Sequence, residues 1–204
     1  MGRSKAKTLY WVWKKYNVGG WEEKLREVGV VTQEDVNGFL RLVGERDKLW
    51  RSWKLGWFVS LVLEYCYNGR FIELDVETVG GKINVGHRLD WDGVVYVNGD
   101  LSGIIGHHMN NGCIFVDGCV DGLVGSAMSG GEIYVNGNVS KCIGFCMEGG
   151  MVIVAGCVSG YVGYRIREGV IVVMGTVDRA DRLKDLGDGL VVVNGFVYLG
   201  RHAR

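Results

Sequence analysis

The sequence predicts a mainly β protein, a right-handed parallel β-helix of about six coils of 19 residues preceded by a small α-helical N-terminal domain. Three observations predict this fold class. Glycine recurs every 19 residues, alternating apolar residues follow each of these glycines, and the composition changes sharply near residue 72. We therefore expect a helical, tryptophan-rich domain over residues 1–72 and a parallel β-helix domain over residues 73–204.

The change in composition separates a basic half from an acidic half. Residues 1–72 hold 13 Lys and Arg against 8 Asp and Glu, whereas residues 73–204 hold 10 against 15. Six of the seven tryptophans precede residue 58, and 26 of the 34 glycines follow residue 72. The formal net charge of the whole chain is zero, so the composition does not favour nucleic acid as a partner.

Two helices are expected in the N-terminal part. Thr32 is suited to cap the first helix, with Asp35 three residues later. A second helix from Glu45 to about Tyr65 carries a row of large side chains along one side, namely Trp50, Trp53, Trp57, Leu61 and Tyr65. After it, the alternation of Ile72, Leu74 and Val76 with acidic residues predicts the strand that starts the stack.

The repeat itself is set by glycines at spacings of 19, 19, 19, 19 and 20 residues, which are Gly93, Gly112, Gly131, Gly150, Gly169 and Gly189. Apolar residues two and four places after each glycine predict one short strand per copy. These inward residues begin with Val95 and Val97 and recur to Val191 and Val193. Copies of this length stack as coils of a parallel β-helix, in which equivalent side chains form inward columns.

A second glycine follows six places after the first, and Asn or Asp precedes it in four of the six copies. Such a pair often forms a hairpin, but "NGDLSG" and "NGNVSK" offer a single apolar residue before the next break. We therefore expect corners rather than hairpins, each followed by one inward residue, from Leu101 to Val197. After Gly175 the repeat is interrupted by "TVDRADRLKDLGDG", which predicts a short inserted helix.

The glycines 13 places into the first four coils, Gly106, Gly125, Gly144 and Gly163, are also interpreted as corners. A phosphate-binding loop needs a helix N-terminus behind its glycines, and the repeat predicts none there. No nucleotide or other cofactor is expected.

The recurrent pattern in "GHHMNNGCIFVDG", "GSAMSGGEIYVNG" and "GFCMEGGMVIVAG" resembles the glycine-repeat (GXGXG) β-helix family, which includes the C-terminal domain of glutamate synthase large subunits and one of the subunits of formylmethanofuran dehydrogenase. The resemblance covers roughly residues 80–200. It implies a right-handed β-helix that serves as a structural or docking part of a larger enzyme, whose chemistry is carried elsewhere.

The side chains that point away from the core form two nearly uncharged columns, which we call the outward face. One column consists of Tyr96, Phe115, Tyr134, Ile153, Val172 and Val192, and the other of Val94, Cys113, Glu132, Met151, Val170 and Leu190. At a strand spacing of about 4.8 Å this face is roughly 29 Å long and approaches about 300 Å², the size of a typical contact patch. We expect the second helix, about 31 Å long, or a second subunit to cover it.

Four polar residues at one corner, His107, His108, Asn110 and Asn111, form the candidate for a metal or proton-transfer site, with polar surface as the alternative. Neighbouring strand residues point to opposite sides, so we expect the two histidines not to share a metal, and no metal is expected. The six cysteines show no zinc-finger spacing. Cys119, Cys142, Cys146 and Cys157 are interpreted as small apolar filling.

Two further clusters each allow two interpretations. "KAKTLYWVWKKY" near the N-terminus combines lysines with aromatic rings, as single-stranded nucleic-acid sites do, but also fits a buried strand. Arg165, Arg167 and Glu168, with Lys141 and Glu148 nearby, indicate a salt-bridged surface or an anion site.

Taken together, these patterns predict a non-catalytic β-helix scaffold or assembly module that contacts a protein partner or another copy of itself. The alternative is an accessory subunit of an oxidoreductase or amidotransferase complex, as the resemblance implies, and a third possibility is an enzyme that uses the His107 corner. The N-terminus shows no secretory signal and the most apolar window, residues 55–67, is too short to span a bilayer. A cytoplasmic protein without membrane contact is therefore expected.

Overall fold

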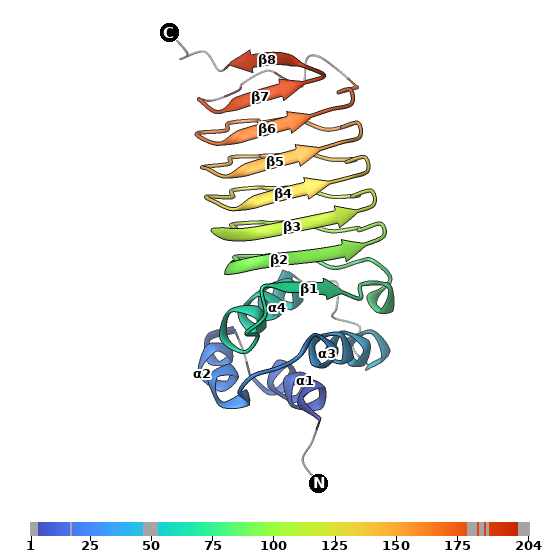
Figure 1. Ribbon diagram of the computed structural model, residues 1–204, viewed down its shortest axis with the longest axis vertical. Helices are drawn as coiled ribbons and strands as arrows, with labels where there is room; N and C mark the ends of the chain where they lie inside the picture. Colours follow the sequence, from blue (N-terminus) through green and yellow to red (C-terminus); the bar gives the residue numbers. More distant parts are fainter. Residues whose placement is uncertain are drawn as a thin grey trace.

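A computed structural model of the chain contains four helices followed by a parallel β-solenoid of about six coils (Figure 1). It describes residues 4–16, 18–46, 53–178, 183, 186 and 188–199. In Figure 1 the strands cross the near side from left to right, and the chain returns behind them while it climbs, so the solenoid is right-handed. The predicted fold class is confirmed.

Eight strands form one sheet in sequence order. They are β1 Phe71–Leu74, β2 Asp90–Asn98, β3 Asn111–Asp117, β4 Glu132–Val135, β5 Met151–Val154, β6 Val170–Val173, β7 Leu190–Val193 and β8 Phe196–Leu199. From β1 to β7 all pairs are parallel, and equivalent residues of successive coils lie opposite one another, as Ile114 lies opposite Ile133. The 19-residue spacing in the sequence is thus the register of the sheet.

The core is a continuous shaft of branched apolar side chains inside the coils. The inward column Val95, Ile114, Ile133, Val152, Ile171 and Val191 is at most 1% exposed. Two further sides of each coil are joined by single bridges, for example Val120 with Val139 and Val124 with Ile143. Met109, Met128 and Met147 are fully buried and fill the third corner. Every column therefore repeats the same contacts one coil higher.

The regular spacing of the corner glycines has a steric cause. A Cβ on Gly118 would lie 2.3 Å from the carbonyl oxygen of Gly99 in the coil below. Gly106 has a φ of 66°, and a Cβ there would lie 2.3 Å from the Cδ1 of Ile133. At these corners the backbone or a side chain of the neighbouring coil lies too close for a Cβ. The interpretation of these glycines as corners where a Cβ would clash is confirmed.

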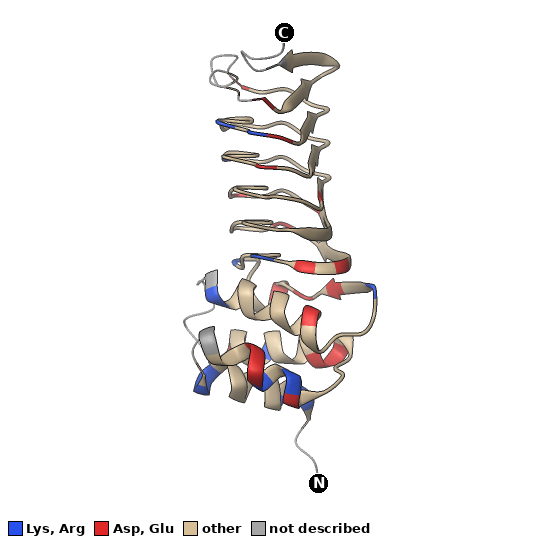
Figure 2. Cartoon of the chain, turned by 90° about the vertical axis from the view of Figure 1, so that its left-hand side faces the viewer, with Lys and Arg blue, Asp and Glu red and all other residues tan. Residues whose placement is uncertain are grey.

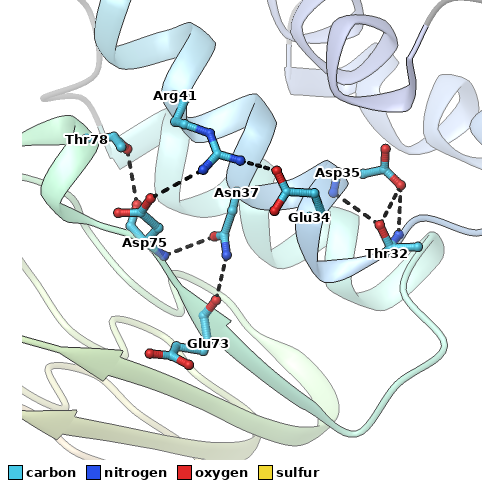
Figure 3. A network of polar contacts seen from close by, with 8 residues as sticks. All are labelled: Thr32, Glu34, Asp35, Asn37, Arg41, Glu73, Asp75 and Thr78. Carbon is cyan, nitrogen blue, oxygen red and sulfur yellow. Dashed lines mark hydrogen bonds and ion pairs between the residues drawn. The ribbon is translucent and has the colours of Figure 1, made fainter.

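The helices are α1 Lys5–Lys15, α2 Val18–Val28, α3 Gln33–Arg46 and α4 Trp53–Tyr65, followed by a single 3₁₀ turn at Glu77–Val79. The cap of α3 is as predicted, because Thr32 Oγ1 accepts from the Asp35 N–H and Asp35 accepts from the Thr32 N–H and hydroxyl (Figure 3). The second predicted helix corresponds to α4, but its expected start is wrong, because Glu45 and Arg46 belong to α3. Residues 47–52, with Trp50, lie outside the described part of the chain.

The expectation that this helix lies along the outward face is wrong. α3 and α4 lie below β1 and close the N-terminal end of the shaft, and no described helix lies over strands β2–β7 (Figure 1). α4 buries Leu55, Phe58 and Leu61, among others, and so needs apolar neighbours on most of its circumference. An open shaft end offers that environment, whereas a flat outer face would cover only one side of the helix. Figure 2 shows the same arrangement from the side, with most of the Lys and Arg residues on the helices.

The exposed edge of β1 is capped by side chains of α3 (Figure 3). Asn37 donates to the carbonyl of Glu73 at 2.9 Å and accepts from the Asp75 N–H at 3.0 Å. Gln33 accepts from the Glu73 N–H at 3.1 Å. Arg41 of the same helix pairs with both Glu34 and Asp75. These amides replace the hydrogen bonds that a preceding strand would supply, which protects the edge from strand addition.

At the other end β8 turns back and pairs antiparallel with β7. The expected corner at Asn194 and Gly195 is therefore wrong for this copy, since both residues have positive φ values of 47° and 78° and form a two-residue hairpin. Val197, expected in an inward column, lies on β8 and is 61% exposed. The reason is local, because "FVYL" supplies four strand-forming residues where the other corners are followed by one.

The proposed domain boundary between residues 72 and 73 falls inside β1. The inserted helix predicted after Gly175 lies mostly outside the described residues. Within the inserted segment, Leu186 is described and forms an antiparallel bridge with Tyr164. Within the described ranges, no helix combines the length and the hydropathy needed to cross a bilayer.

Candidate functional site

The outward face lies on the sheet side of the solenoid, along β2–β7 (Figure 1). Its two columns alternate with the buried inward residues, as predicted, because neighbouring strand residues point to opposite sides of the sheet. Glu132 is exposed and the other eleven side chains are partly exposed. The face is therefore accessible along its whole length in the described structure, and Glu132 carries its single charge.

Aromatic rings form a stacked ladder over the lower half of the face. The ring centroids are 5.4 Å apart between Tyr96 and Phe115 and 4.8 Å apart between Phe115 and Tyr134, with interplanar angles of 13° and 9°. Phe71 extends the ladder, with its ring 6.3 Å from that of Tyr96. Sequence reasoning missed Phe71, although the inward positions of Ile72 and Leu74 already place it on the outward side. Stacking fixes each ring, so the face is preorganised.

A polar border follows the ladder on the side where the strands end. Tyr96 donates its hydroxyl to Asp117 at 3.2 Å, and the Asn136 amide donates to the same carboxylate at 2.8 Å. Desolvation and this hydrogen bond to Asp117 raise the pKa of Tyr96. The border holds the first ring of the ladder in place.

On the opposite side, where the strands begin, a shallow hollow of about 510 Å³ adjoins the second column. Its floor contains Gly93, Gly112 and Gly131, and its rim carries Glu132 and an ion pair of 3.2 Å between Arg70 and Asp92. Absent side chains on three stacked coils create this hollow. A side chain of a partner that lies across the face has room to enter here.

The histidine corner differs from the prediction. His107 and His108 lie in a tight turn rather than on a strand, since His108 has a φ of 55°, and their ring centroids are 4.3 Å apart. The expectation that the two rings point to opposite sides is therefore wrong. Asn110 accepts from the Ser129 hydroxyl at 2.7 Å, and Asn111 of β3 is paired with Asp90 of β2. Both asparagines therefore contact residues of neighbouring coils.

His87 is a third member of this corner that sequence reasoning missed. Its ring lies 5.2 Å from that of His107 and 6.0 Å from that of Trp57 on α4, and the Arg88 guanidinium lies 5.1 Å from the Trp57 ring. His87 occupies the same turn position one coil below His107, a correspondence visible in "GHRL" and "GHHM". These histidines join the first coil to the helical cap.

Burial lowers the pKa of His87 to about 4, and the neighbouring His107, His108 and Arg88 act in the same direction. Burial also lowers the pKa of His107, against the effect of its 3.0 Å contact with the Ser126 carbonyl. Both rings are neutral at pH 7. Among the described residues, no group of three or more His, Cys, Asp and Glu side chains is arranged to hold a metal ion.

All six cysteines are free thiols. The four interpreted as apolar filling are partly exposed, so that interpretation is wrong. Cys119 accepts from the Asn138 N–H at 3.4 Å, and Cys157 accepts from the Thr176 hydroxyl at 3.3 Å. They belong to a corner column in which each side chain accepts from the coil above, as Asn138 does from the Cys157 N–H. The hydrogen bonds from Thr176 lower the pKa of Cys157.

The two charged clusters lie on the surface of the solenoid and on the first helix. Arg167 pairs with Glu148 at 2.6 Å and Lys141 lies 3.8 Å from Asp121, which confirms a salt-bridged surface. The N-terminal "KAKTLYWVWKK" forms α1, so the alternative of a buried strand is wrong. On this helix Trp13 is buried, whereas Trp11 is 39% exposed, with the Lys15 ammonium 4.5 Å from its ring.

Comparisons of the chain with models of known protein families, with curated proteins and with solved structures find no match.

Proposed function

We propose that this protein is a non-catalytic scaffold or assembly module whose outward face contacts a partner protein. The observation that carries the proposal is the accessible, almost uncharged outward face, which extends over six coils. A contiguous apolar surface of about 300 Å² reaches the size of the largest patch on a typical single-chain protein, and such patches are often functional.

The form of this face supports a protein partner rather than a small ligand. The face is flat, its rings are fixed by stacking, and the strands below them are locked into one register by the sheet. A surface that presents aromatic residues and has polar groups at its border is typical of protein interfaces. The adjoining hollow gives such a partner one place to anchor a side chain.

The histidine corner supports a structural role for the first coil. His87 and Arg88 contact Trp57 of α4, and Glu64 of the same helix accepts from the Asp90 N–H at 3.0 Å. These contacts hold the helical cap on the solenoid. An accessory role in an oxidoreductase or amidotransferase complex is the specific form of this proposal that the glycine-repeat resemblance suggests.

The proposal is tested by affinity purification of three forms of the full chain from its native cells. They are the wild type, the double variant Phe115→Lys/Val172→Lys, and the control Ser102→Lys, an exposed position away from the outward face. We expect the same partner to co-purify with the wild type and the control but not with the double variant. A flavin, iron–sulfur or molybdopterin absorbance in the partner would support the accessory role. Retention of the partner by the double variant would contradict the proposal.

A further inference from the structure

The two ends of the sheet are treated differently by the fold. At the β1 edge, Gln33 and Asn37 bind the backbone groups that face away from β2. At the other edge is β8, and among the residues that the structure describes none pairs with its outer side. An exposed strand edge of this kind is a template for a further strand.

The backbone groups on the open edge follow from the hairpin. Asn194 and Leu190 direct their N–H groups toward the β6 side, where they bond to Val173 and Gly169. Alternation along β7 therefore turns Val191 and Val193 toward β8, where they face Tyr198 and Phe196. By the same alternation, the N–H and C=O groups of Val197 and Leu199 point outward. Two residues of β8 thus present donors and acceptors to the open edge.

The side chains of β8 leave the end of the core open. Phe196 lies opposite the buried Val193 and is therefore on the inward side of the sheet, yet it is 68% exposed. Val197 is 61% exposed, and the strand "FVYL" contains neither a charge nor a proline. The usual devices that block strand addition, such as an edge lysine or proline, are absent from this strand.

We propose that β8 pairs with β8 of a second copy of this chain, so that two solenoids join end to end around a twofold axis. A twofold axis makes the two strands antiparallel, and an axis at Tyr198 places Val197 of each copy opposite Leu199 of the other. That register lets each copy's two outward residues exchange backbone hydrogen bonds with their counterparts. The sheet then continues from one copy to the next.

A second copy fits this edge because the strand is complementary to itself. Twofold pairing around Tyr198 brings the two copies of the same four-residue strand side by side, so a charge on β8 would lie close to the same charge of the other copy, and β8 carries none. The same pairing would cover Phe196 of each copy with the inward side of the other strand. The proposal goes beyond the proposed function and does not use the outward face, so either can fail without the other.

The size of the contact sets the expected affinity. A four-residue strand is about 14 Å long, and the contact extends about 10 Å, one sheet-to-sheet distance, on each face of the sheet. The area of contact is therefore roughly 300 Å² per copy. A standard stable interface buries about 800 Å² per partner. We therefore expect a weak dimer, with a dissociation constant in the micromolar range or above, roughly 1–100 µM.

The test is analytical ultracentrifugation of the full chain from about 1 to about 500 µM, a range that brackets this affinity. Val197→Pro removes an N–H that points to the open edge and leaves the hydrogen bonds between β7 and β8 in place. Val197→Lys keeps the N–H but places two like charges at the contact, and Val172→Lys on the outward face is the control. Circular dichroism confirms that each variant is folded.

We expect the wild type and Val172→Lys to shift from monomer to dimer as the concentration rises, and both Val197 variants to weaken the dimer at least about 10-fold. A wild type that stays monomeric over the whole concentration range would overturn the proposal, and so would a dimer that both Val197 variants leave unchanged. A dimer abolished by Val172→Lys alone would assign self-association to the outward face and would also overturn it.

Discussion

Replacement of Asn37 by alanine should destabilise the protein by about 2–4 kcal/mol. Asn37 is 8% exposed and makes two hydrogen bonds, to the Glu73 carbonyl of β1 and from the N–H of Asp75, which follows β1. Each bond contributes about 1 kcal/mol, and a backbone group left buried without a partner costs about 1–3 kcal/mol. Both hydrogen bonds are part-buried, and truncation of Asn37 removes the partner of each backbone group.

The measurement is urea unfolding followed by circular dichroism, with Gln33→Ala as the matched control. Gln33 makes one hydrogen bond to the same strand at an exposed site, so its loss should cost less than about 1 kcal/mol. With a denaturant slope of about 2–3 kcal/mol/M, Asn37→Ala should lower the urea midpoint by about 1 M. If Asn37→Ala lies within about 0.5 kcal/mol of the wild type, the edge-capping role of Asn37 is refuted, and if Gln33→Ala costs as much as Asn37→Ala, the larger contribution assigned to Asn37 is refuted.

Three further predictions concern the corners of the coils. Gly122→Ala should cost more than about 2 kcal/mol in urea unfolding, because the new Cβ would lie 1.5 Å from the Gly103 oxygen, and a cost below about 0.5 kcal/mol would contradict the close approach of the coils. The pKa of His87 is about 4 when folded and 6.5 when unfolded, so the unfolded chain binds more protons between these values and stability should fall by about 1–3 kcal/mol as the pH drops from 7 to 4. His87→Gln should flatten that pH dependence, and an unchanged profile would exclude His87 as its source. Of the thiols, Cys157 should react fastest with iodoacetamide, since Thr176 lowers its pKa, and Cys66 should react slowest, since burial raises its pKa to about 11. Peptide mass spectrometry measures the order of reaction, and Thr176→Val should slow the reaction of Cys157 alone.

The repeat was predictable because, in a parallel β-helix, the spacing of equivalent residues along the sequence equals the register between neighbouring strands. Equivalent residues such as Ile114 and Ile133 pack on each other, so the 19-residue spacing specifies both the strand and its neighbour. The outward column from Tyr96 to Val192 followed from the same alternation. Phe71 was missed because β1 precedes the first regular glycine and its spacing to β2 is not that of the repeat.

The ends of the stack were harder to predict, because they depend on contacts that no repeat encodes. The length of the second helix matched the height of the coils, but α4 buries Leu55, Phe58 and Leu61 and therefore needs apolar neighbours on several sides, which the end of the shaft provides. At the other end, "NGFVYLG" differs from "NGDLSG" only in the residues after the first glycine, and those residues make a hairpin. The close approach of His107 and His108 depends on a positive φ that a non-glycine residue seldom adopts.

The role of the outward face as a protein contact is tested most directly by site-specific photo-cross-linking in the native cells. A photoreactive phenylalanine analogue replaces Tyr134, at the end of the stacked ladder, and in a second form it replaces Ser102, away from the face. We predict one discrete cross-linked product from position 134 and none from position 102, with the product lost when Val172→Lys is added. Equal products from both positions, or none from position 134, would contradict the proposed role of this face.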